Sequence, residues 1–360
     1  MLQVLFTLDY EIHGNGQGSP HRLMVEPTER MLRQFDRHGA KLTVMADVGE
    51  ILRFRRHAEE TGRDEFSYRT IEHQLKTAVR TGHDVQFHVH PSYFNAVRED
   101  GRWRQDYSEY DVARLSFDRI DEIVSTGKGY LEGLLQPVDR SYRCVAFRAA
   151  NWSMHPSPNI VQALVRNGIR IDSSVFKGGR REGMVEFDYR NAHSAVIPWR
   201  VDPEDVCRAK PDGELIEVPI CTESRHLHHF ARPNRVYRAV QGRLHPLPSE
   251  SLALAGDKQE ASSSTRTQRA LAALTSRHAW KLDFNQCSGR QLIAALERVS
   301  KRYDTADRTL PVVLIGHSKI YTKLNERLLE PFLNHVASRP DRFSFATFRD
   351  TLPDLTKLAA

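Results

Sequence analysis

Two pairs of side chains that could bind a metal ion or move protons stand at predicted strand ends, two residues apart. Asp9 and Glu11 follow the first apolar segment, and His88 and His90 end the third. Because side chains alternate along a strand, the members of each pair point to the same side. Imidazole nitrogens and carboxylate oxygens are usual ligands of catalytic zinc and related ions. The sequence therefore predicts a metal set of histidines and a carboxylate.

Three further strand ends carry polar groups. Arg148 lies in the fourth segment and is soon followed by Asn151 and Trp152, Asp172 lies in the fifth, and His317 follows the last. The carboxyl ends of barrel strands share one mouth, where α/β barrels keep their active sites. We therefore expect all five residues at this mouth, with Asn151, Trp152 and Asp172 as substrate contacts.

The elements that must position these residues are short apolar segments that alternate with helical patterns along the chain. Such alternation predicts a parallel sheet covered by helices, and seven or eight such units favour a barrel over an open sheet. The predicted fold class is therefore α/β. The predicted strands are Leu2–Leu8, Lys41–Ala46, Asp84–His90, Val145–Ala149, Gly168–Ser173, Ala195–Trp199, Glu214–Ile220 and Leu310–Gly316.

Composition narrows the class of protein further. The chain has 360 residues, of which 40% are hydrophobic and 27% charged, so it can bury a sizeable core. Its net charge of +6 is weak, and the basic residues are not interleaved with aromatic ones, so we expect no nucleic-acid partner. Four separated cysteines without a CxxC pair argue against a disulfide framework. The start MLQVLFTLDYE lacks a basic signal-peptide region, so we expect a cytoplasmic protein that begins at Met1.

Residues 223–285 interrupt the alternation and form a predicted insertion between barrel segments 1–222 and 286–360. The stretch 223–280 shows no clear strand, and it carries nine Arg and Lys side chains against four acidic ones. A solvated surface element is the simpler interpretation. The alternative is a basic lid that faces an anionic substrate, a lipid-linked precursor or an anionic membrane surface.

The order of these motifs resembles that of the polysaccharide deacetylase superfamily, also called NodB-like or carbohydrate esterase family 4. Residues 7–11 are similar to its opening acidic motif, 82–90 to its histidine motif and 147–150 to its arginine motif. Residues 217–220 and 315–317 are similar to its late strands. The resemblance covers most of the chain and implies a distorted (β/α)7-8 barrel.

The resemblance also implies a metal-dependent amide hydrolase that deacetylates an N-acetylated sugar or glycoconjugate precursor. Asp9 would accept a proton from the attacking water, Arg148 would orient Asp9, and His317 would protonate the leaving amine. The implied cofactor is a divalent metal, with zinc as first choice, which polarises the acetyl carbonyl. Its implied ligands are Glu11, His88 and His90.

Two departures from the usual family motifs leave alternatives open. Asp-Tyr-Glu replaces two adjacent aspartates, and His-x-His replaces a helical H-x-x-x-H pair. Asp9 could then be a ligand with Glu11 as the base. In a second alternative, Asp9, Glu11 and His317 hydrolyse a C–N bond of a small cyclic amide without metal, and in a third the barrel is inactive and binds sugar. Three aromatic side chains either stack on sugar rings or cover the core, namely Trp103, Tyr107 and Tyr110.

Overall fold

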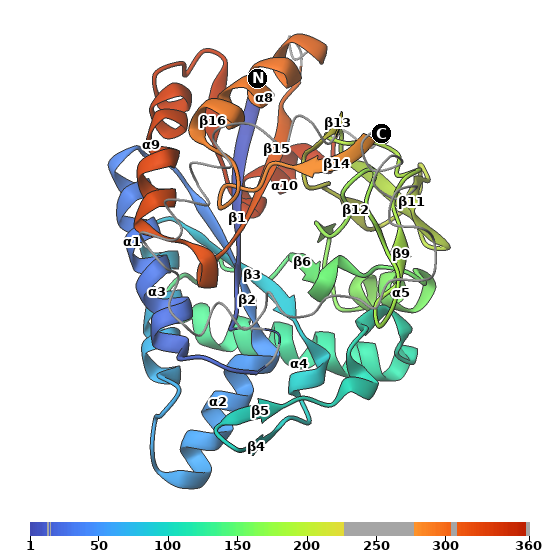
Figure 1. Cartoon of the computed structure of the whole chain (residues 1–360). Helices are drawn as coiled ribbons and strands as arrows, with labels where there is room; N and C mark the ends of the chain where they lie inside the picture. The colour runs from blue at the N-terminus through green and yellow to red at the C-terminus, as the bar shows by residue number, and fades with distance from the viewer. Residues whose placement is uncertain (13, 15, 227–276, 304–307, 358–360) are drawn as a thin grey trace, which may run out of the picture.

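The computed structural model describes residues 1–12, 14, 16–226, 277–303 and 308–357. A mixed sheet curls around the centre of the molecule, and helices surround it (Figure 1). The strand order is β11-β10-β12-β7-β6-β3-β2-β1-β15, and β16 pairs with the start of β1. The predicted α/β fold with a distorted barrel is therefore confirmed.

The strands of this sheet are β1 (Leu2–Tyr10), β2 (Leu42–Asp47), β3 (Asp84–Val89), β6 (Ala146–Ala149), β7 (Ile171–Asp172), β10 (Trp199–Asp202), β11 (Asp205–Ala209), β12 (Ile216–Glu217), β15 (Leu310–His317) and β16 (Phe343–Phe345). Three hairpins lie outside it, formed by β4 (Val97–Glu99) with β5 (Arg102–Arg104), β8 (Arg180–Arg181) with β9 (Phe187–Asp188), and β13 (Thr222–His226) with β14 (Arg277–Lys281).

The α-helices are α1 (Glu26–Arg37), α2 (Val48–Thr61), α3 (Tyr68–Arg80), α4 (Phe117–Leu135), α5 (Pro158–Arg166), α8 (Gly289–Arg302), α9 (Lys323–Ala337) and α10 (Phe348–Leu355). Short helical turns are η1 (His21–Val25), η2 (Pro91–Tyr93), η3 (Tyr107–Glu109), η4 (Val112–Arg114), η5 (Ala150–Trp152) and η8 (Ser318–Ile320).

Local sequence explains several helix ends. Helices α8 and α9 begin at capping boxes. In each box the hydroxyl of the residue before the helix, Ser288 or Thr322, accepts a backbone N–H from the first turn. The side-chain oxygen of Gln291 or Asn325 in turn accepts the backbone N–H of that residue. Helix α5 ends just before Gly168, whose φ of +71° is the left-handed conformation that glycine adopts readily.

Strand register brings the polar strand ends to the same edge of the sheet. Parallel pairing sets Asp9 of β1 beside His317 of β15. On the other side, Asp47 of β2 is in register with His88 of β3, and His88 with Arg148 of β6. Between the two groups, Asp9 is in register with Met45, two residues before Asp47, so the row of polar side chains shifts by two residues from β1 to β2 along the carboxyl edge of the sheet.

The two faces of β1 have different partners. Phe6 packs against Phe35 of α1, with ring centroids 4.6 Å apart, and burying such a ring contributes about 1.5–3 kcal/mol. Thr7 and Asp9 point to the opposite side, where both accept hydrogen bonds from Arg148 across the barrel interior. The alternation predicted from the sequence therefore holds along this strand.

The barrel closes through single bridges instead of a continuous ladder. Ile220, just after β12, pairs with Val313 of β15, and Asp283, just after β14, pairs with Ile315. The β13–β14 hairpin begins beside these bridges. We call this region the seam of the barrel.

The predicted strand Ala195–Trp199 is wrong except at its last residue. The Ser194 hydroxyl accepts the N–H groups of Val196 and Ile197, which turns the chain before a strand can form. Strand β10 begins at Trp199 and runs antiparallel to β12. Local side-chain bonding has therefore outweighed an apolar pattern.

The absence of a strand in 223–280 is also a wrong prediction. Strands β13 and β14 form an antiparallel hairpin that pairs Thr222 with Lys281 and His226 with Arg277. Their sequences are mostly polar and carry no alternating apolar pattern, and Thr222 is the one buried residue of the two strands. Residues 227–276 of the predicted insertion lie outside the described residues, so the basic lid stays a prediction.

All four cysteines are buried and free, in agreement with the expected lack of a disulfide framework. Among the described helices, none combines the length and the apolar character that crossing a bilayer requires.

Candidate metal centre and catalytic pocket

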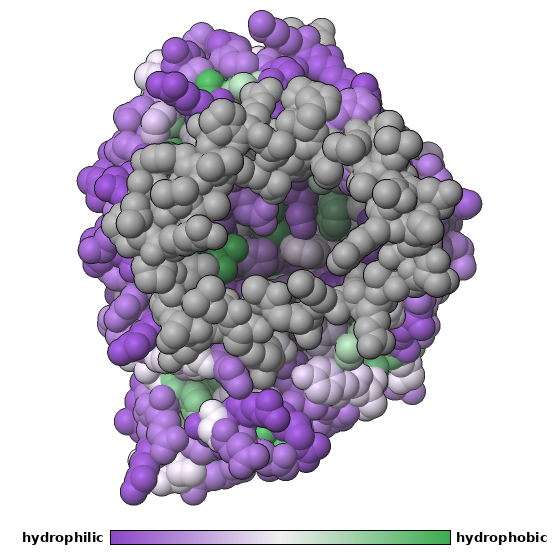
Figure 2. Space-filling view, viewed as in Figure 1, coloured by the Kyte–Doolittle hydropathy of each residue, from purple (hydrophilic) through white to green (hydrophobic). Residues whose placement is uncertain are grey.

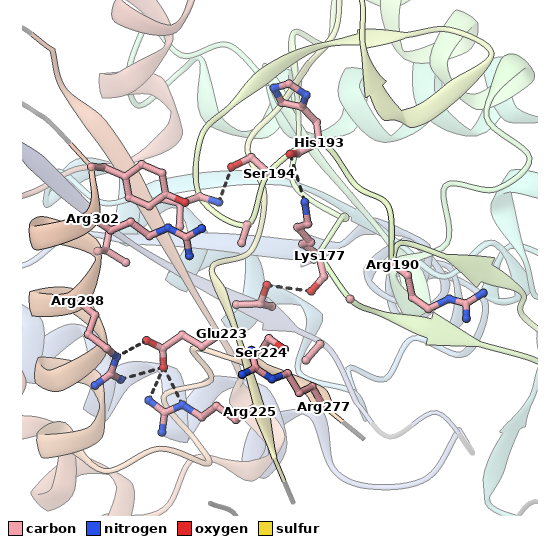
Figure 3. A pocket seen from close by; sticks show the side chains of 17 residues that line it. Lys177, Arg190, His193, Ser194, Glu223, Ser224, Arg225, Arg277, Arg298 and Arg302 are labelled. Carbon is pink, nitrogen blue, oxygen red and sulfur yellow. Dashed lines mark hydrogen bonds and ion pairs between the residues drawn. The ribbon is translucent and has the colours of Figure 1, made fainter. Parts of the chain in front are cut away.

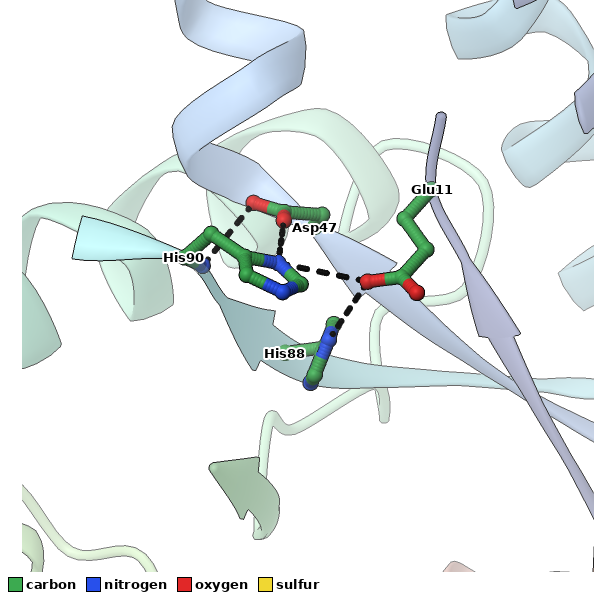
Figure 4. Close-up of side chains that lie close together, drawn as sticks. All are labelled: Glu11, Asp47, His88 and His90. Carbon is green, nitrogen blue, oxygen red and sulfur yellow. Dashed lines mark hydrogen bonds and ion pairs between the residues drawn. The ribbon is translucent and has the colours of Figure 1, made fainter. Parts of the chain in front are cut away.

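Four side chains with little solvent exposure converge at the carboxyl ends of β1, β2 and β3 (Figure 4). Glu11 Oε2 lies 3.1 Å from His88 Nε2 and 3.2 Å from His90 Nδ1, and Asp47 Oδ2 lies 2.5 Å from His90 Nδ1. One donor atom of each residue lies within 4.8 Å of the others. Ligands of a tetrahedral ion with bonds of about 2.1 Å lie about 3.4 Å apart. The two Glu11 distances are close to this spacing, whereas the Asp47–His90 contact is a hydrogen bond that would lengthen on metal binding, so this donor set could hold a metal ion.

A hydrogen bond on the far side of His88 orients its ring toward the other donors. His88 Nδ1 lies 2.8 Å from the Arg148 carbonyl oxygen, which can only accept, so Nδ1 carries a hydrogen. Nε2 then faces Glu11. A neutral His88 would turn a lone pair toward a carboxylate, so this contact is favourable when His88 is protonated or a cation lies between them. Metal-binding histidines are commonly oriented in this way.

Opposite charges stabilise the ionised forms of this centre. Burial alone lowers the pKa of His88, but the hydrogen bond to Glu11 and the charge of Asp9 raise it to about 9. Burial also opposes ionisation of Glu11, yet Lys319 and the two histidines hold the pKa of its carboxyl well below its usual range. Lys319 Nζ donates to Glu11 Oε1 at 2.6 Å, which leaves Oε2 for the histidines.

Asp47 also caps a helix. Its Oδ1 accepts the N–H groups of Glu50 at 3.2 Å and His90 at 3.3 Å, so the start of α2 is tied to the end of β3. Burial, together with Asp47 and Glu11, raises the pKa of the Glu50 carboxyl well above its ordinary value. Glu50 therefore keeps its proton more readily than an exposed glutamate does.

A second buried group lies beside the metal cluster. Arg148 is fully buried, and its Nη1 donates to Asp9 Oδ1 and Thr7 Oγ1, both at 2.8 Å. Its Nε donates to the Ser173 carbonyl at 2.8 Å. Burial alone raises the pKa of Asp9, but Arg148 and His317 lower it below its ordinary value. Arg148 therefore holds Asp9 as an ionised carboxylate in one orientation.

His317 faces the other oxygen of Asp9. Its Nε2 lies 3.5 Å from Asp9 Oδ2, and its backbone N–H donates to Asn285 Oδ1 at 2.6 Å. Burial lowers the pKa of His317, and the nearby carboxylates restore only part of that loss. An imidazole beside an oriented carboxylate can take up and release a proton, which is the arrangement that acid–base chemistry requires.

The two groups open into one pocket of about 560 Å³. The face seen in Figure 1 is hollowed at its centre, and the described side chains within the hollow are both hydrophilic and hydrophobic (Figure 2). Asp9, Glu11, His88, His90 and His317 all line the pocket. The remaining wall includes Tyr107, Tyr110, Asn151, Trp152, Arg181 and Lys319.

The predicted substrate contacts lie in two different places. Asn151 and Trp152 line the pocket, and their contact with a substrate stays a prediction. Asp172 does not line it. Asp172 is fully buried at the end of β7, where its Oδ1 accepts the Ser174 hydroxyl at 2.6 Å. This position fits a supporting role in the core better than a substrate contact.

The three aromatic residues between β3 and α4 also lie in two different places. Trp103 is buried against Phe54 and Phe66, with ring centroids 6.1 and 5.1 Å away. Tyr107 and Tyr110 line the pocket instead. Trp103 therefore covers the core, whereas the two tyrosines are placed where a sugar ring could stack.

Asp47 and Lys319 belong to the site but are absent from the sequence prediction. Asp47 follows a predicted apolar strand by one residue, which is the signal that drew attention to Asp9. Lys319 lies two residues after His317 and shares its parity. The sequence contains both signals. Their meaning depends on where each strand ends and how far each side chain extends, which the sequence does not show.

A larger pocket of about 860 Å³ lies at the seam, and its charged lining is mostly basic (Figure 3). Glu223 there forms ion pairs with Arg225 and with Arg298, the latter at 2.7 Å. Its lining lacks a group of histidines and carboxylates at ligand spacing in the described part of the chain. The further basic side chains are Lys177, Arg190, Arg277 and Arg302.

A scan against protein-family models gives no match, and a search of curated proteins gives none either. Among solved structures, the chain is similar to a protein from Parabacteroides distasonis described as a glycoside hydrolase/deacetylase. The TM-score is 0.56 at 12% identity, and the match covers 99% of this chain and 71% of that one. A 4-alpha-glucanotransferase from Thermococcus litoralis matches with TM-score 0.50 at 12% identity, over 98% of this chain and 40% of that one.

A protein from Mycobacterium smegmatis described as a polysaccharide deacetylase matches over 99% of this chain and 91% of that one, at 12% identity and TM-score 0.49. At such identities the likeness concerns the fold. The chain thus has an α/β barrel of the kind found in the glycoside hydrolase/deacetylase and the glucanotransferase described above. The deacetylase-type barrel that the resemblance implied is therefore confirmed as a fold.

Proposed function

We propose that this chain is a metal-dependent amide hydrolase that removes the acetyl group from an N-acetylated sugar or glycoconjugate precursor. The observation that carries the proposal is the convergence of two groups on one pocket. One is the donor set of Glu11, Asp47 and the two histidines, and the other is the Asp9–Arg148 pair beside His317.

The protein's own residues can carry the proton transfers. Asp9 is held ionised by Arg148 and is placed to accept a proton from an attacking water. His317 Nε2 lies 3.5 Å from Asp9 Oδ2, so a proton can pass toward the leaving amine on the same side of the pocket. Arg148 reaches no pocket surface and acts only by positioning Asp9.

Glu11, Asp47, His88 and His90 would hold the metal ion, and the nitrogen and oxygen donors favour zinc or a neighbouring transition metal. When bound, such an ion polarises the acyl carbonyl and lowers the pKa of water. The fourth ligand, Asp47, adds a carboxylate to the set expected from the sequence.

The proposal is tested by acetate release from N-acetylglucosamine oligomers with the wild type, Asp9→Asn and His317→Ala. Both variants should lose at least about a hundredfold in kcat, since each removes a proton-transfer group. His193→Ala is the matched control, because His193 is exposed and outside this pocket. Full activity of Asp9→Asn would contradict the assignment.

A second candidate is a metal-independent C–N hydrolase, and Lys319 is the observation that favours it. Its ammonium pairs with Glu11 at 2.6 Å and supplies a permanent positive charge at the pocket. Elemental analysis and chelation separate the candidates. If the enzyme depends on a metal, about one ion should be bound per chain. Chelation should then abolish the activity, and added zinc should restore it.

The cellular setting belongs to the same proposal. We propose a cytoplasmic enzyme that acts on a sugar precursor during polysaccharide synthesis, before export of the polymer. Acetate release from a nucleotide-linked acetyl sugar, compared with release from a preformed extracellular polymer, tests this part. Exclusive use of the polymer would contradict it.

A further inference from the structure

We propose that the pocket wall formed by Asn151, Trp152 and Arg181 binds an anionic group of the substrate, and we call this wall the anion subsite. The inference rests on the proposed function and adds a substrate class to it. The substrate would be an acylated sugar that also carries a carboxylate or a phosphate.

The carboxylates that line the pocket already have cationic partners. Asp9 pairs with Arg148 at 2.8 Å, and Glu11 pairs with Lys319 at 2.6 Å. Arg181 of β8 lines the same pocket without a carboxylate at ion-pair distance among the residues described. Its guanidinium donates one hydrogen bond, to Asn151 Oδ1 at 2.9 Å. The surplus charge of this wall is therefore positive.

Asn151 offers a donor that the protein does not use. Its Nδ2 is buried and has no hydrogen-bond acceptor within the described part of the chain. Buried donors are nearly always paired, so an unpaired one in a pocket wall is a position where a ligand or an ordered water would be bound. Asn151 and Trp152 also have φ values of +54° and +61°, and such backbone strain concentrates at ligand sites.

A second cation lies against the indole of the same wall. Lys281 of β14 places its Nζ 3.3 Å from the Trp152 ring centroid and 4.4 Å from that of Phe176. No carboxylate lies within ion-pair distance of Lys281 in the part of the chain that the structure covers. Burial lowers its pKa to about 8, which the charge of Asp283 only partly offsets. Lys281 therefore adds positive potential behind Trp152.

These groups share one chemical preference. The free N–H groups of Arg181, the Nδ2 of Asn151 and the nearby ammonium of Lys281 all favour a ligand with two or more acceptor oxygens and a negative charge. Carboxylate and phosphate both meet that description. A neutral sugar hydroxyl would satisfy the Asn151 donor but would leave the surplus charge without a counterion.

The test measures binding by calorimetry to the full chain with three matched probes: N-acetylglucosamine, N-acetylglucosamine 1-phosphate and N-acetylglucosaminuronic acid. At least one anionic probe should bind about tenfold or more tightly than the neutral sugar, as expected for one charge-assisted hydrogen-bonded pair. The tighter anionic probe identifies phosphate or carboxylate as the recognised group. Equal binding of all three probes would overturn the inference.

Two variants examine the residues directly. Arg181→Gln should remove the preference for the anionic probe, and Asn151→Asp should do so too, because the new carboxylate would pair with Arg181. Arg180→Gln is the matched control, since Arg180 pairs with Glu182 and does not line the pocket. A preference that survives in Arg181→Gln at wild-type size would also overturn the inference.

Acetate release separates this inference from the proposed function. If the wild type prefers an anionic probe but releases no acetate from any acetylated sugar, the anion subsite stands and the deacetylase proposal fails. If it releases acetate equally well from neutral and anionic sugars, with Arg181→Gln unchanged, the deacetylase proposal stands and the anion subsite fails.

Discussion

Two regions of the barrel present their polar groups in different ways. The regular half consists of β1, β2, β3, β6 and β15 with the turn η8 that follows, and β1 and β15 are nine and eight residues long. The short-strand region runs from η5 to β14, and its β7 and β12 have two residues each. In the regular half, buried charges meet opposite charges. In the short-strand region, and among the residues that the structure describes, Asn151 Nδ2 has no acceptor, and Arg181 and Lys281 have no carboxylate at ion-pair distance.

The comparison indicates that the two regions of the barrel have different roles. Long parallel strands hold side chains in fixed directions, so charges can be paired and catalytic groups kept in place. Short strands and turns follow the local chain instead, and they can leave groups free to meet a ligand. Substitutions should therefore harm catalysis and stability in the regular half but mainly affinity in the short-strand region.

The largest effect is expected for Arg148→Met. The change leaves Asp9 buried without its cation, and breaking a buried pair in this way costs about 3–5 kcal/mol of unfolding free energy. We also expect kcat/KM to fall at least about a thousandfold, because the base loses both its orientation and its charge partner. Urea denaturation and acetate release measure the two effects. Arg143→Met, at an exposed arginine that bonds only carbonyls, should be near wild type.

Asp47→Asn should weaken metal binding at least about tenfold, because one anionic donor becomes a neutral amide while the cap to Glu50 can persist. Isothermal titration calorimetry with zinc measures this affinity. Asp36→Asn is the control, since Asp36 pairs with His83 away from the cluster. Unchanged zinc affinity in Asp47→Asn would remove Asp47 from the ligand set.

The pH dependence should show a smaller but distinct effect. Burial lowers the pKa of His317 below its ordinary 6.5, with Asp9 offsetting only part of the shift. If protonated His317 gives its proton to the leaving amine, kcat/KM falls as pH rises through that lowered pKa. The alkaline limb of the pH–rate profile should therefore lie below 6.5. An alkaline limb above that value would assign proton donation to another group.

The smallest effect is expected for Trp152→Phe in the short-strand region. A phenyl ring keeps the wall apolar but weakens the contact with Lys281, which is of the order of 0.5–2 kcal/mol. KM for an anionic sugar should rise less than about tenfold while kcat and the unfolding free energy stay near wild type. Trp280→Phe, which alters the contact with Arg225 instead, is the matched control. A large fall in kcat would place Trp152 in the catalytic group.

The sequence by itself determined the fold class and the direction of the side chains on the long strands. Asp9 and His88 lie on β1 and β3, and Glu11 and His90 follow each strand by one residue, so the two-residue period predicts that the members of each pair share a face. Long apolar segments that end in polar residues also identify the mouth of a barrel. These inferences need only local geometry, so they hold for the regular half.

Only the tertiary structure decided what those side chains meet. Strand register set His88 beside both Asp47 and Arg148, and folding brought Lys319 to Glu11. The pairing of β13 with β14, which delivers Lys281 to Trp152, depends on residues far apart in the chain. Local patterns carry no information about such contacts, because burial, charge pairing and the closure of the seam are properties of the whole fold.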